Sequence, residues 1–315
     1  MELALIESVL SIAIRAGTSV LFATLGGIMT ERSGVLNLGI EGIMLLSALA
    51  GFAGAFYSGS VLVGAFAGMI VGALVSAIHA FWCITLSANQ VASGLALVIF
   101  STGLADFVGQ NLGPEGSTLV GLTGPRLQRF PIPGLSTMPI VGEAVFNQDI
   151  LTYLLYLLVP LIWFFLFRTQ PGIHLRAAGE NPRAADSLGV NVTRLRYIYT
   201  IVGGLLIGLG GVHLSLAYTP GWNVDITSGR GWIAIAMVIF SLWNPMRAVI
   251  GALLFGGVTA IQFRMQAAGT SIPTFFLSMA PYIATIIALL FISGRRSLYR
   301  HSGVPSALGT VYHRE

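Results

Sequence analysis

Residues 34–54 read GVLNLGIEGIMLLSALAGFAG, a stretch apolar enough to cross a bilayer that nevertheless holds Asn37 and Glu41 in its first third. Residues four apart lie on one face of an α-helix, so a helix here would present both side chains together. A carboxylate near the bilayer centre costs about 2.5–3.5 kcal/mol on insertion scales and usually marks function. Glycines flank the pair at Gly34, Gly39 and Gly42. Because glycine weakens helices, this spacing predicts an interrupted span.

Three interpretations of the polar pair stay open. Broken spans are tolerated only where they face protein or a water-filled cavity, so Asn37 and Glu41 are candidates to line a translocation path. Alternatively, hydropathy sets the span boundary wrongly and both residues lie in the cytoplasmic interface. In the third interpretation Glu41 is structural and binds the amides of a broken helix, since helix N-termini favour carboxylates.

Composition predicts a membrane protein built from helices. Of the 315 residues, 55% are hydrophobic and only 9% are charged, with a mean hydropathy of +0.83, whereas a soluble domain carries about 25% charged residues. The apolar runs do not alternate as barrel strands do. Nine of them are expected to cross the bilayer, at 8–28, 35–57, 60–86, 91–109, 149–167, 197–217, 231–243, 247–263 and 275–293. We therefore expect an all-α polytopic fold of about 8–10 transmembrane helices.

Several classes of chemistry lack the residues they need. All 16 basic residues are arginine, so the chain has no P-loop or Schiff-base lysine and cannot bind ATP through a Walker A motif. Cys83 is the only cysteine, and the five histidines show no metal-ligand spacing. The acidic start, with Glu2 and Glu7, is not that of a signal peptide. We expect no catalytic residues, no bound metal or other cofactor, and no nucleic acid partner.

The distribution of arginine predicts the orientation in the membrane. Residues 168–196 hold five arginines and the tail, 295–315, holds four, whereas the irregular segment 110–148 holds only two. By the positive-inside rule, 168–196 and 295–315 are cytoplasmic and 110–148 is external. An odd number of spans then places the N-terminus outside and the C-terminus in the cytoplasm.

Two further polar stretches stand out. In TLSANQVASG (residues 85–94), Asn89 and Gln90 interrupt two apolar runs on the same side of the membrane as Asn37 and Glu41. Their amides donate and accept hydrogen bonds and suit a neutral polar solute, although a plain tight turn explains them equally well. A weaker signal is a candidate internal repeat: residues 25–42 and 209–236 share a Gly-Gly, a polar gap and a Ser-Gly before a new apolar run.

The cytoplasmic segment 168–196 predicts two short helices. Asn181 suits an N-cap, Pro182 the first helical position and Gly189 a helix stop, which together predict a helix over about 182–188. The preceding stretch predicts another short helix that stops at Gly179. Two capped helices outside the bilayer are typical of a docking element, and the alternative is a solvated loop, against which the caps argue.

Four stretches together carry a resemblance to a known family. They are ERSGVLNLGIEGIMLLSALAGF (31–52), SANQVASGLAL (87–97), LRAAGENPRAADSLGVNVTRLRY (175–197) and GRGWIAIAMVIFSLWNPMRAVIGALLFG (229–256). The chain resembles, over residues 15–310, the permease subunits of bacterial ABC importers for nucleosides, within the group that includes ribose and branched-chain amino-acid permeases. It departs from many relatives at Val98, where they have asparagine.

The resemblance implies a single permease domain over residues 1–315, with inverted repeats and broken helices, in the bacterial inner membrane. It implies a second permease subunit, usually a paralogue, a cytoplasmic ABC ATPase that carries the ATP, and an extracytoplasmic substrate-binding lipoprotein. The polar stretch with Asn37 and Glu41 matches the helix that lines the pathway. The region that matches the ATPase-coupling loop contains Glu180, Asn181, Pro182, Arg183, Asp186 and Gly189.

The function expected is import of a neutral polar solute, most of all nucleosides. A simple sugar such as a pentose is the alternative within the same class. A secondary transporter without an ATPase is a second alternative, but it needs ion-coupling carboxylates deep in several spans, and Glu41 is the one strong candidate. An intramembrane enzyme needs a nucleophile, a base or a metal cluster, and the sequence shows none of these.

Overall fold

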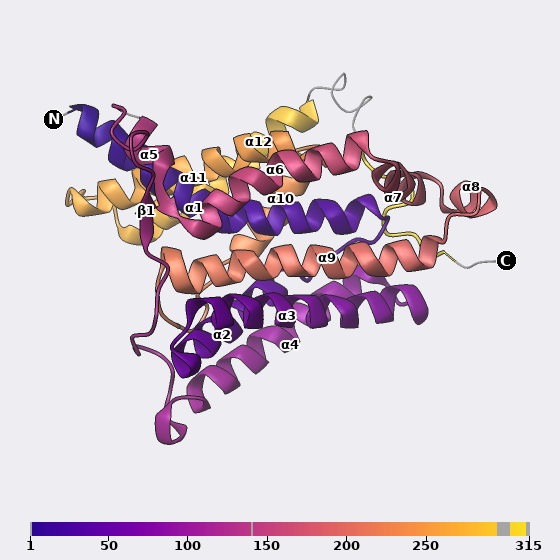
Figure 1. Cartoon of the computed structure of the whole chain (residues 1–315), viewed down its shortest axis with the longest axis horizontal. Coiled ribbons are helices and arrows are strands. Elements are labelled where there is room, and N and C mark those ends of the chain that lie inside the picture. The colour runs from indigo at the N-terminus through magenta and orange to yellow at the C-terminus, as the bar shows by residue number, and fades with distance from the viewer. Residues whose placement is uncertain (1, 140, 295–302, 313–315) are drawn as a thin grey trace.

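The computed structural model describes residues 2–139, 141–294 and 303–312. Within them the chain is mainly helical, with one two-stranded sheet (Figure 1). The α-helices are α1 (Glu2–Arg32), α2 (Ile40–Ser58), α3 (Val61–Ala80), α4 (Gln90–Asn111), α5 (Val141–Phe146), α6 (Ile150–Arg168), α7 (Gln170–Glu180), α8 (Pro182–Ser187), α9 (Val192–His213), α10 (Arg230–Phe240), α11 (Pro245–Ala267) and α12 (Thr274–Gly294). The π-helical turns Phe81–Thr85 and Leu214–Tyr218 continue α3 and α9.

The predicted spans correspond to helices of the structure. Seven helices among the described residues are long and apolar enough to cross a membrane, and two shorter apolar stretches lie in α10 and α12. The all-α polytopic prediction is confirmed. One span needs correction: the run at 231–243 is α10, whose 11 residues rise about 16 Å. That is about half of the ~30 Å hydrocarbon layer, so α10 is a half-length helix.

The inner helices of the bundle are α1, α2 and α9. Within the most apolar 18 residues of each helix, 72% of the residues are buried in α1, 78% in α2 and 83% in α9. The same share is 28% in α3 and in α4. Small residues allow the close packing, as the glycines four apart in α3 predict. A Cβ on Gly68 would lie 2.2 Å from the Val212 side chain, and one on Gly72 would lie 2.4 Å from the Gly204 carbonyl oxygen of α9.

The two similar stretches 25–42 and 209–236 form two helix–break–helix units. The chain breaks between α1 and α2 at residues 33–39, and between α9 and α10 at residues 219–229. Both breaks carry a Ser-Gly, in which Gly34 (φ +91°) and Gly229 (φ +76°) adopt left-handed backbone conformations. The first turns of α2 and α10 contact each other, so the two breaks meet inside the bundle.

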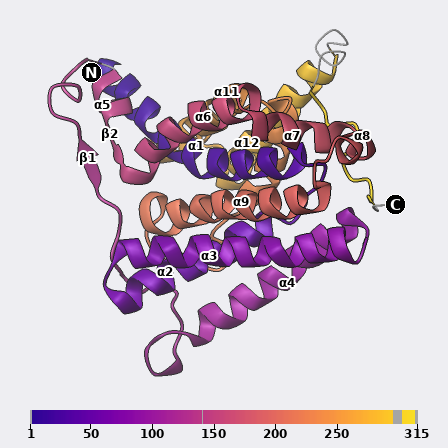
Figure 2. The same ribbon diagram turned by 45° about the vertical axis from the view of Figure 1, so that its right-hand side comes forward.

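The two ends of the bundle differ in character (Figures 1 and 2). The start of α1, α5 and both strands lie at one end, and α7, α8 and residues 303–312 lie at the other. The segment 110–148 belongs to the first end. Beyond α4 it holds a 3₁₀ turn (Pro114–Gly116), strand β1 (Arg129–Pro131), α5 and the start of β2 (Asn147–Asp149), which pairs antiparallel with β1. The segments 110–148 and 168–196 thus lie at opposite ends of the bundle, which agrees with the opposite sides of the membrane predicted from the arginine distribution.

The predicted cytoplasmic helices are present as α7 and α8. Asn181 accepts a hydrogen bond from the Ala184 N–H at 3.1 Å, which confirms the N-cap, and Gly189 (φ +85°) follows the end of α8. The predicted stop at Gly179 is wrong, because α7 continues through Glu180. A Cβ on Gly179 would lie 2.3 Å from the Arg32 carbonyl oxygen, so this glycine permits close packing on α1.

Candidate functional site

The Glu41 carboxylate binds the start of α10. Its Oε1 accepts hydrogen bonds from the Thr227 hydroxyl at 2.6 Å and the Gly229 N–H at 2.9 Å, and its Oε2 accepts from the Gly231 N–H at 2.5 Å. The residue is 6% exposed. The first N–H groups of a helix have no intrahelical partner, and the helix dipole places positive charge there. Glu41 therefore satisfies the half-helix α10 at its buried N-terminus, as the structural interpretation predicts.

The backbones of α2 and the start of α10 approach so closely at this contact that a glycine is required. A Cβ on Gly231 would lie 2.4 Å from the Glu41 Cα. On the other side of the same backbone, a Cβ on Gly229 would lie 3.1 Å from the Tyr282 hydroxyl oxygen of α12, and that hydroxyl donates to the Ser228 carbonyl. The 228–231 backbone thus lies between the Glu41 carboxylate and α12.

Asn37 lies in the break before α2 and not on the helix. It is fully buried, and its Oδ1 accepts from the Gly39 N–H at 2.9 Å. The expectation that Asn37 and Glu41 share a helical face is therefore wrong, because α2 begins only at Ile40. The chain is non-helical between Arg32 and Ile40, and α2 then runs unbroken to Ser58, so the helix begins after the polar stretch instead of being interrupted within it.

Gln90 and His79 hold the backbone of the same break. The Leu36 N–H donates to Gln90 Oε1 at 2.7 Å, and the Leu36 carbonyl lies 3.0 Å from His79 Nε2. Because a carbonyl only accepts, Nε2 carries the proton, and in the neutral ring Nδ1 accepts from the Ser93 hydroxyl at 3.0 Å. The Asn37 and Gln90 amide nitrogens have no hydrogen-bond partner among the described residues. This cluster fixes the bend between α1 and α2.

Asn89 has a different environment from Gln90. It is exposed, and its side chain caps α4 by accepting from the Ala92 N–H at 3.0 Å. Of the four residues expected in the pathway, the structure brings Asn37 and Gln90 to the same break and places Glu41 at α10. Asn89 lies on the surface at the same end of the bundle.

The α7–α8 element projects from the bundle and contacts the C-terminal segment. Leu188, directly after α8, is 85% exposed. Glu180 accepts from the backbone N–H and the hydroxyl of Ser306 at 3.1 and 2.8 Å, and the Ala307 N–H donates to the Gly179 carbonyl. A groove of about 480 Å³ between the two segments is lined by Glu180, Asn181, Pro182, Arg183, Ser306, Ala307, Thr310, Val311 and Tyr312. The tail arginines 295, 296, 300 and 314 lie outside the described residues.

A polar cavity of about 540 Å³ lies where α10, α11 and α12 meet. Asp225, Ser228 and Arg230 line it from the break before α10 and its first residue. Gln262 and Phe263 line it from α11, together with Phe255 and Thr259 of the same helix. Ser278, Met279, Pro281 and Tyr282 line it from α12, and the exposed side chains of Met279 and Tyr282 show that it is open on this side. This cavity shares the 228–230 backbone with the Glu41 contact.

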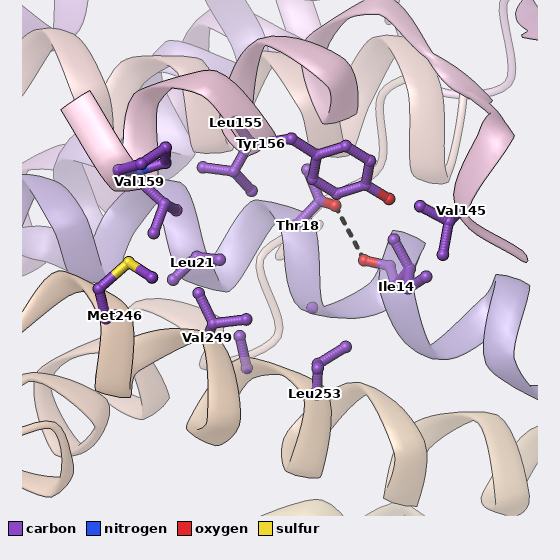
Figure 3. Close-up of a pocket in the computed structure, with 13 residues that line it drawn as sticks. Ile14, Thr18, Leu21, Val145, Leu155, Tyr156, Val159, Met246, Val249 and Leu253 are labelled. Atoms are coloured by element: carbon purple, nitrogen blue, oxygen red, sulfur yellow. Dashed lines mark hydrogen bonds between the residues drawn. The ribbon is translucent and has the colours of Figure 1, made fainter. Parts of the chain in front are cut away.

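A second hollow is apolar and unsuited to a polar solute. It has a volume of about 400 Å³ between α1, α6 and α11 (Figure 3). Its lining offers only two hydroxyl groups, those of Thr18 and Tyr156. The Thr18 hydroxyl already donates to the Ile14 carbonyl at 2.8 Å, the dashed line in Figure 3. An acyl chain fits this lining better than a nucleoside or sugar.

A buried contact between His213 and Asp149 links α9 to the start of α6 at the end of the bundle that holds the strands. His213 Nε2 lies 3.3 Å from Asp149 Oδ2, and Asp149 also accepts from the Leu151 and Thr152 N–H groups at the start of α6. Burial raises the pKa of the Asp149 carboxyl, but the His213 imidazole and the Thr152 hydrogen bonds outweigh burial and lower that pKa below its ordinary value. The described residues contain no group of three or more metal-ligating side chains.

The sequence indicates some of these residues but not their partners. Thr227, Gly229 and Gly231 lie in the stretch TSGRG, where the two glycines mark a close backbone approach but not its partner. The polar residues around the cavity are scattered over the ends of three helices. The five histidines show no metal-ligand spacing, and the sequence gives no sign that one of them, His79, contacts the Leu36 carbonyl.

Comparison with known proteins identifies the family. Residues 8–293 match the family described as "Branched-chain amino acid transport system / permease component". The "Putative glucose ABC transporter permease protein TsgC13" of Haloferax volcanii is 41% identical over 97% of both chains. The "Nucleoside ABC transporter permease protein NupC" of Lactococcus lactis is 34% identical over 91% of this chain and 92% of its own. The "Guanosine ABC transporter permease protein NupQ" of Bacillus subtilis is 33% identical over 96% of this chain and 99% of its own.

A solved structure supports the same assignment at the level of the fold. An ABC transporter in an inward-facing conformation superposes with a TM-score of 0.51 at 16% identity, over 91% of this chain and 85% of that one. The family match and the relatives both cover most of the chain. The protein is therefore a multi-pass membrane permease of an ABC transporter and belongs to the branched-chain amino acid transport system permease family.

Proposed function

We propose that this chain is one permease subunit of an ABC importer that carries nucleosides into the cytoplasm. The observation that carries this proposal is the similarity, over more than nine tenths of both chains, to two permeases named for nucleosides and guanosine. The polar cavity beside α10 supports it, because a neutral solute with hydroxyl groups matches a lining of hydroxyl, amide and aromatic side chains with one acidic and one basic side chain.

A simple sugar is the second candidate substrate. The permease named for glucose shares more identity with this chain than either nucleoside permease does. A sugar uses the same hydroxyl and amide groups, but it has no planar base to place against the aromatic rings.

The α7–α8 element is the proposed docking site for a cytoplasmic ABC ATPase, which binds and hydrolyses the ATP while this chain binds no cofactor. Leu188 is an apolar side chain with no cover in the subunit, and Glu180, Asn181, Pro182 and Arg183 line the adjacent groove. Asp186 and Gly189 belong to the same element through α8 and its stop. Residues 168–196 are thus the coupling loop of a single permease domain.

The orientation in the membrane indicates where the remaining partners would bind. With α7–α8 in the cytoplasm, the N-terminus and residues 110–148 face outside, where a substrate-binding lipoprotein delivers the solute. A second permease subunit, a paralogue, completes the transporter in the inner membrane, and lipid covers the exposed apolar faces of α3, α4 and α6. We propose Asn37, Glu41, Asn89 and Gln90 as residues of the path, where Glu41 acts by holding α10.

Uptake by cells tests the function directly. Cells that carry the complete transporter, with and without this gene, are given labelled guanosine, adenosine, cytidine and uridine, and unlabelled glucose and ribose as competitors. We expect gene-dependent nucleoside uptake that stops when the ATPase subunit is inactivated and persists when ion gradients are collapsed. Gene-dependent uptake of glucose or ribose alone would favour the sugar alternative. Uptake that needs the gradients and not the ATPase would favour a secondary transporter.

A further inference from the structure

The cavity between α10, α11 and α12 lies toward the end of the bundle opposite the docking element. α11 begins at Pro245, next to the end of α1, because the Arg32 guanidinium donates to the Trp243 carbonyl at 3.0 Å. Phe263 lies about 27 Å further along α11 at 1.5 Å per residue. The cavity therefore occupies the half of the bundle that a solute arriving from outside reaches first.

The lining of this cavity is unsuited to lipid. Asp225 and Arg230 are charged and Gln262 carries an amide, and the bilayer strongly disfavours all three groups. Polar side chains within a membrane bundle face protein or a water-filled space. The apolar hollow of Figure 3 shows the contrast, since its lining is almost free of polar groups.

The charges of the cavity match a neutral solute. It holds one acidic and one basic side chain, Asp225 and Arg230. The Arg230 guanidinium donates to the Thr227 carbonyl at 3.2 Å and lies 5.3 Å above the Tyr218 ring, so its charge is directed into the protein. Asp225 and Gln262 then remain as groups that bind hydroxyls.

The shape and the aromatic groups match a nucleoside. A volume of about 540 Å³ lies within the roughly 300–1,000 Å³ typical of small-molecule sites. Phe255, Phe263 and Tyr282 bring three rings to the lining, and aromatic rings bind planar bases by stacking. A solute that uses both the rings and the polar groups needs a flat aromatic part and a part rich in hydroxyls.

We propose that this cavity is a nucleoside-binding site on the import path, with the base against the aromatic side chains and the sugar hydroxyls toward Asp225 and Gln262. The assignment rests on the proposed function and names where the subunit recognises its substrate. The site is mechanically connected to α2, because Tyr282 donates to the Ser228 carbonyl and the next residue, Gly229, donates to Glu41.

Uptake kinetics of the complete transporter test the site. Phe263→Leu removes an aromatic ring but keeps an apolar side chain, and Gln262→Ala removes the amide. We expect each to raise the KM for guanosine at least ten-fold, and Phe263→Leu to lower the preference for guanosine over ribose. Phe164→Leu is the matched control, because Phe164 is an exposed aromatic residue of α6 outside the cavity and should leave KM unchanged.

Cysteine protection provides a test that does not depend on transport rate. Ser278→Cys is a near-isosteric change at the cavity wall, and the one native cysteine, Cys83, is buried. We expect a polar thiol reagent added from outside to label the variant, and saturating guanosine to slow that labelling. Guanosine uptake by the wild type with unchanged KM in both variants and no protection overturns the site while the function stands. No nucleoside uptake by the wild type overturns the function, and the site with it.

Discussion

The Glu41 carboxylate of α2 and the backbone nitrogen of Gly231 in α10 lie 2.5 Å apart, although 190 residues separate them in the sequence. This contact gives a half-length helix a satisfied N-terminus inside the bundle. It also joins the two breaks of the chain, so that a displacement of α10 is transmitted to the start of α2.

Glu41→Gln should lower the free energy of unfolding by about 1.5–3 kcal/mol, the range for hydrogen bonds to charged groups, because Gln keeps one acceptor but loses the charge. Thermal unfolding in detergent measures the effect, and guanosine selectivity should stay unchanged. Glu115→Gln, at an exposed turn outside the bundle, is the control. Unchanged stability with altered selectivity would instead show that Glu41 contacts the solute.

Gly231→Ala should destabilise the protein by about 1–3 kcal/mol, the usual cost of overpacking, because the new methyl group would collide with Glu41. Gly257→Ala in α11 is the matched control, since a Cβ there meets no atom within 4 Å. The control should be neutral or slightly stabilising. Equal unfolding temperatures for the two variants would contradict the close approach of α2 and α10.

Leu188→Ser should weaken association with the ATPase while leaving the isolated subunit stable, because the side chain has almost no contacts within the chain. Asn181→Ala should also reduce association, since loss of the cap costs α8 about 1 kcal/mol. Co-purification of the ATPase measures both. Val224→Ser, at an exposed residue before α10, is the control. Undiminished association in both variants would show that α7–α8 is only a solvated loop.

Cysteines placed at Ala184 and Ser117 should react from opposite sides of the membrane. Both positions are exposed, and Cys83 is buried, so the wild-type chain serves as the blank. An impermeant thiol reagent should label Ser117→Cys in intact cells and Ala184→Cys only after the inner face is opened. The reverse pattern would invert the orientation derived from the arginine distribution.

Asp149→Asn should make stability less sensitive to acid. The native pKa of Asp149 lies below its unfolded value, so its contribution is complete above about pH 4 and is lost as the pH falls toward the native pKa. The wild type should therefore lose stability below about pH 4 more steeply than the variant. At neutral pH the variant should be less stable by about 1.5–3 kcal/mol. Thermal unfolding at pH 3–7 measures both effects, and parallel pH profiles would contradict the assignment.

Local sequence patterns were sufficient for the apolar helices, the two short helices α7 and α8, and the family. Each apolar run that hydropathy identifies is a helix, because the free energy of transfer into lipid is a property of the segment itself. The cap at Asn181 and the stop after α8 were predictable for the same reason, since both interactions involve residues within a few positions of each other.

Tertiary structure alone decided what the polar residues bind. Asn37 and Glu41 are only four residues apart. Asn37 lies in the break before α2, whereas Glu41 lies in the first turn of α2 and contacts the N-terminus of α10, because α2 starts between them. The partners of Glu41, of Gln90 and of the polar cavity come from segments far away in the chain. Their polar groups are satisfied by whichever donors and acceptors the packing of distant helices brings near, and hydropathy and spacing carry no information about those partners.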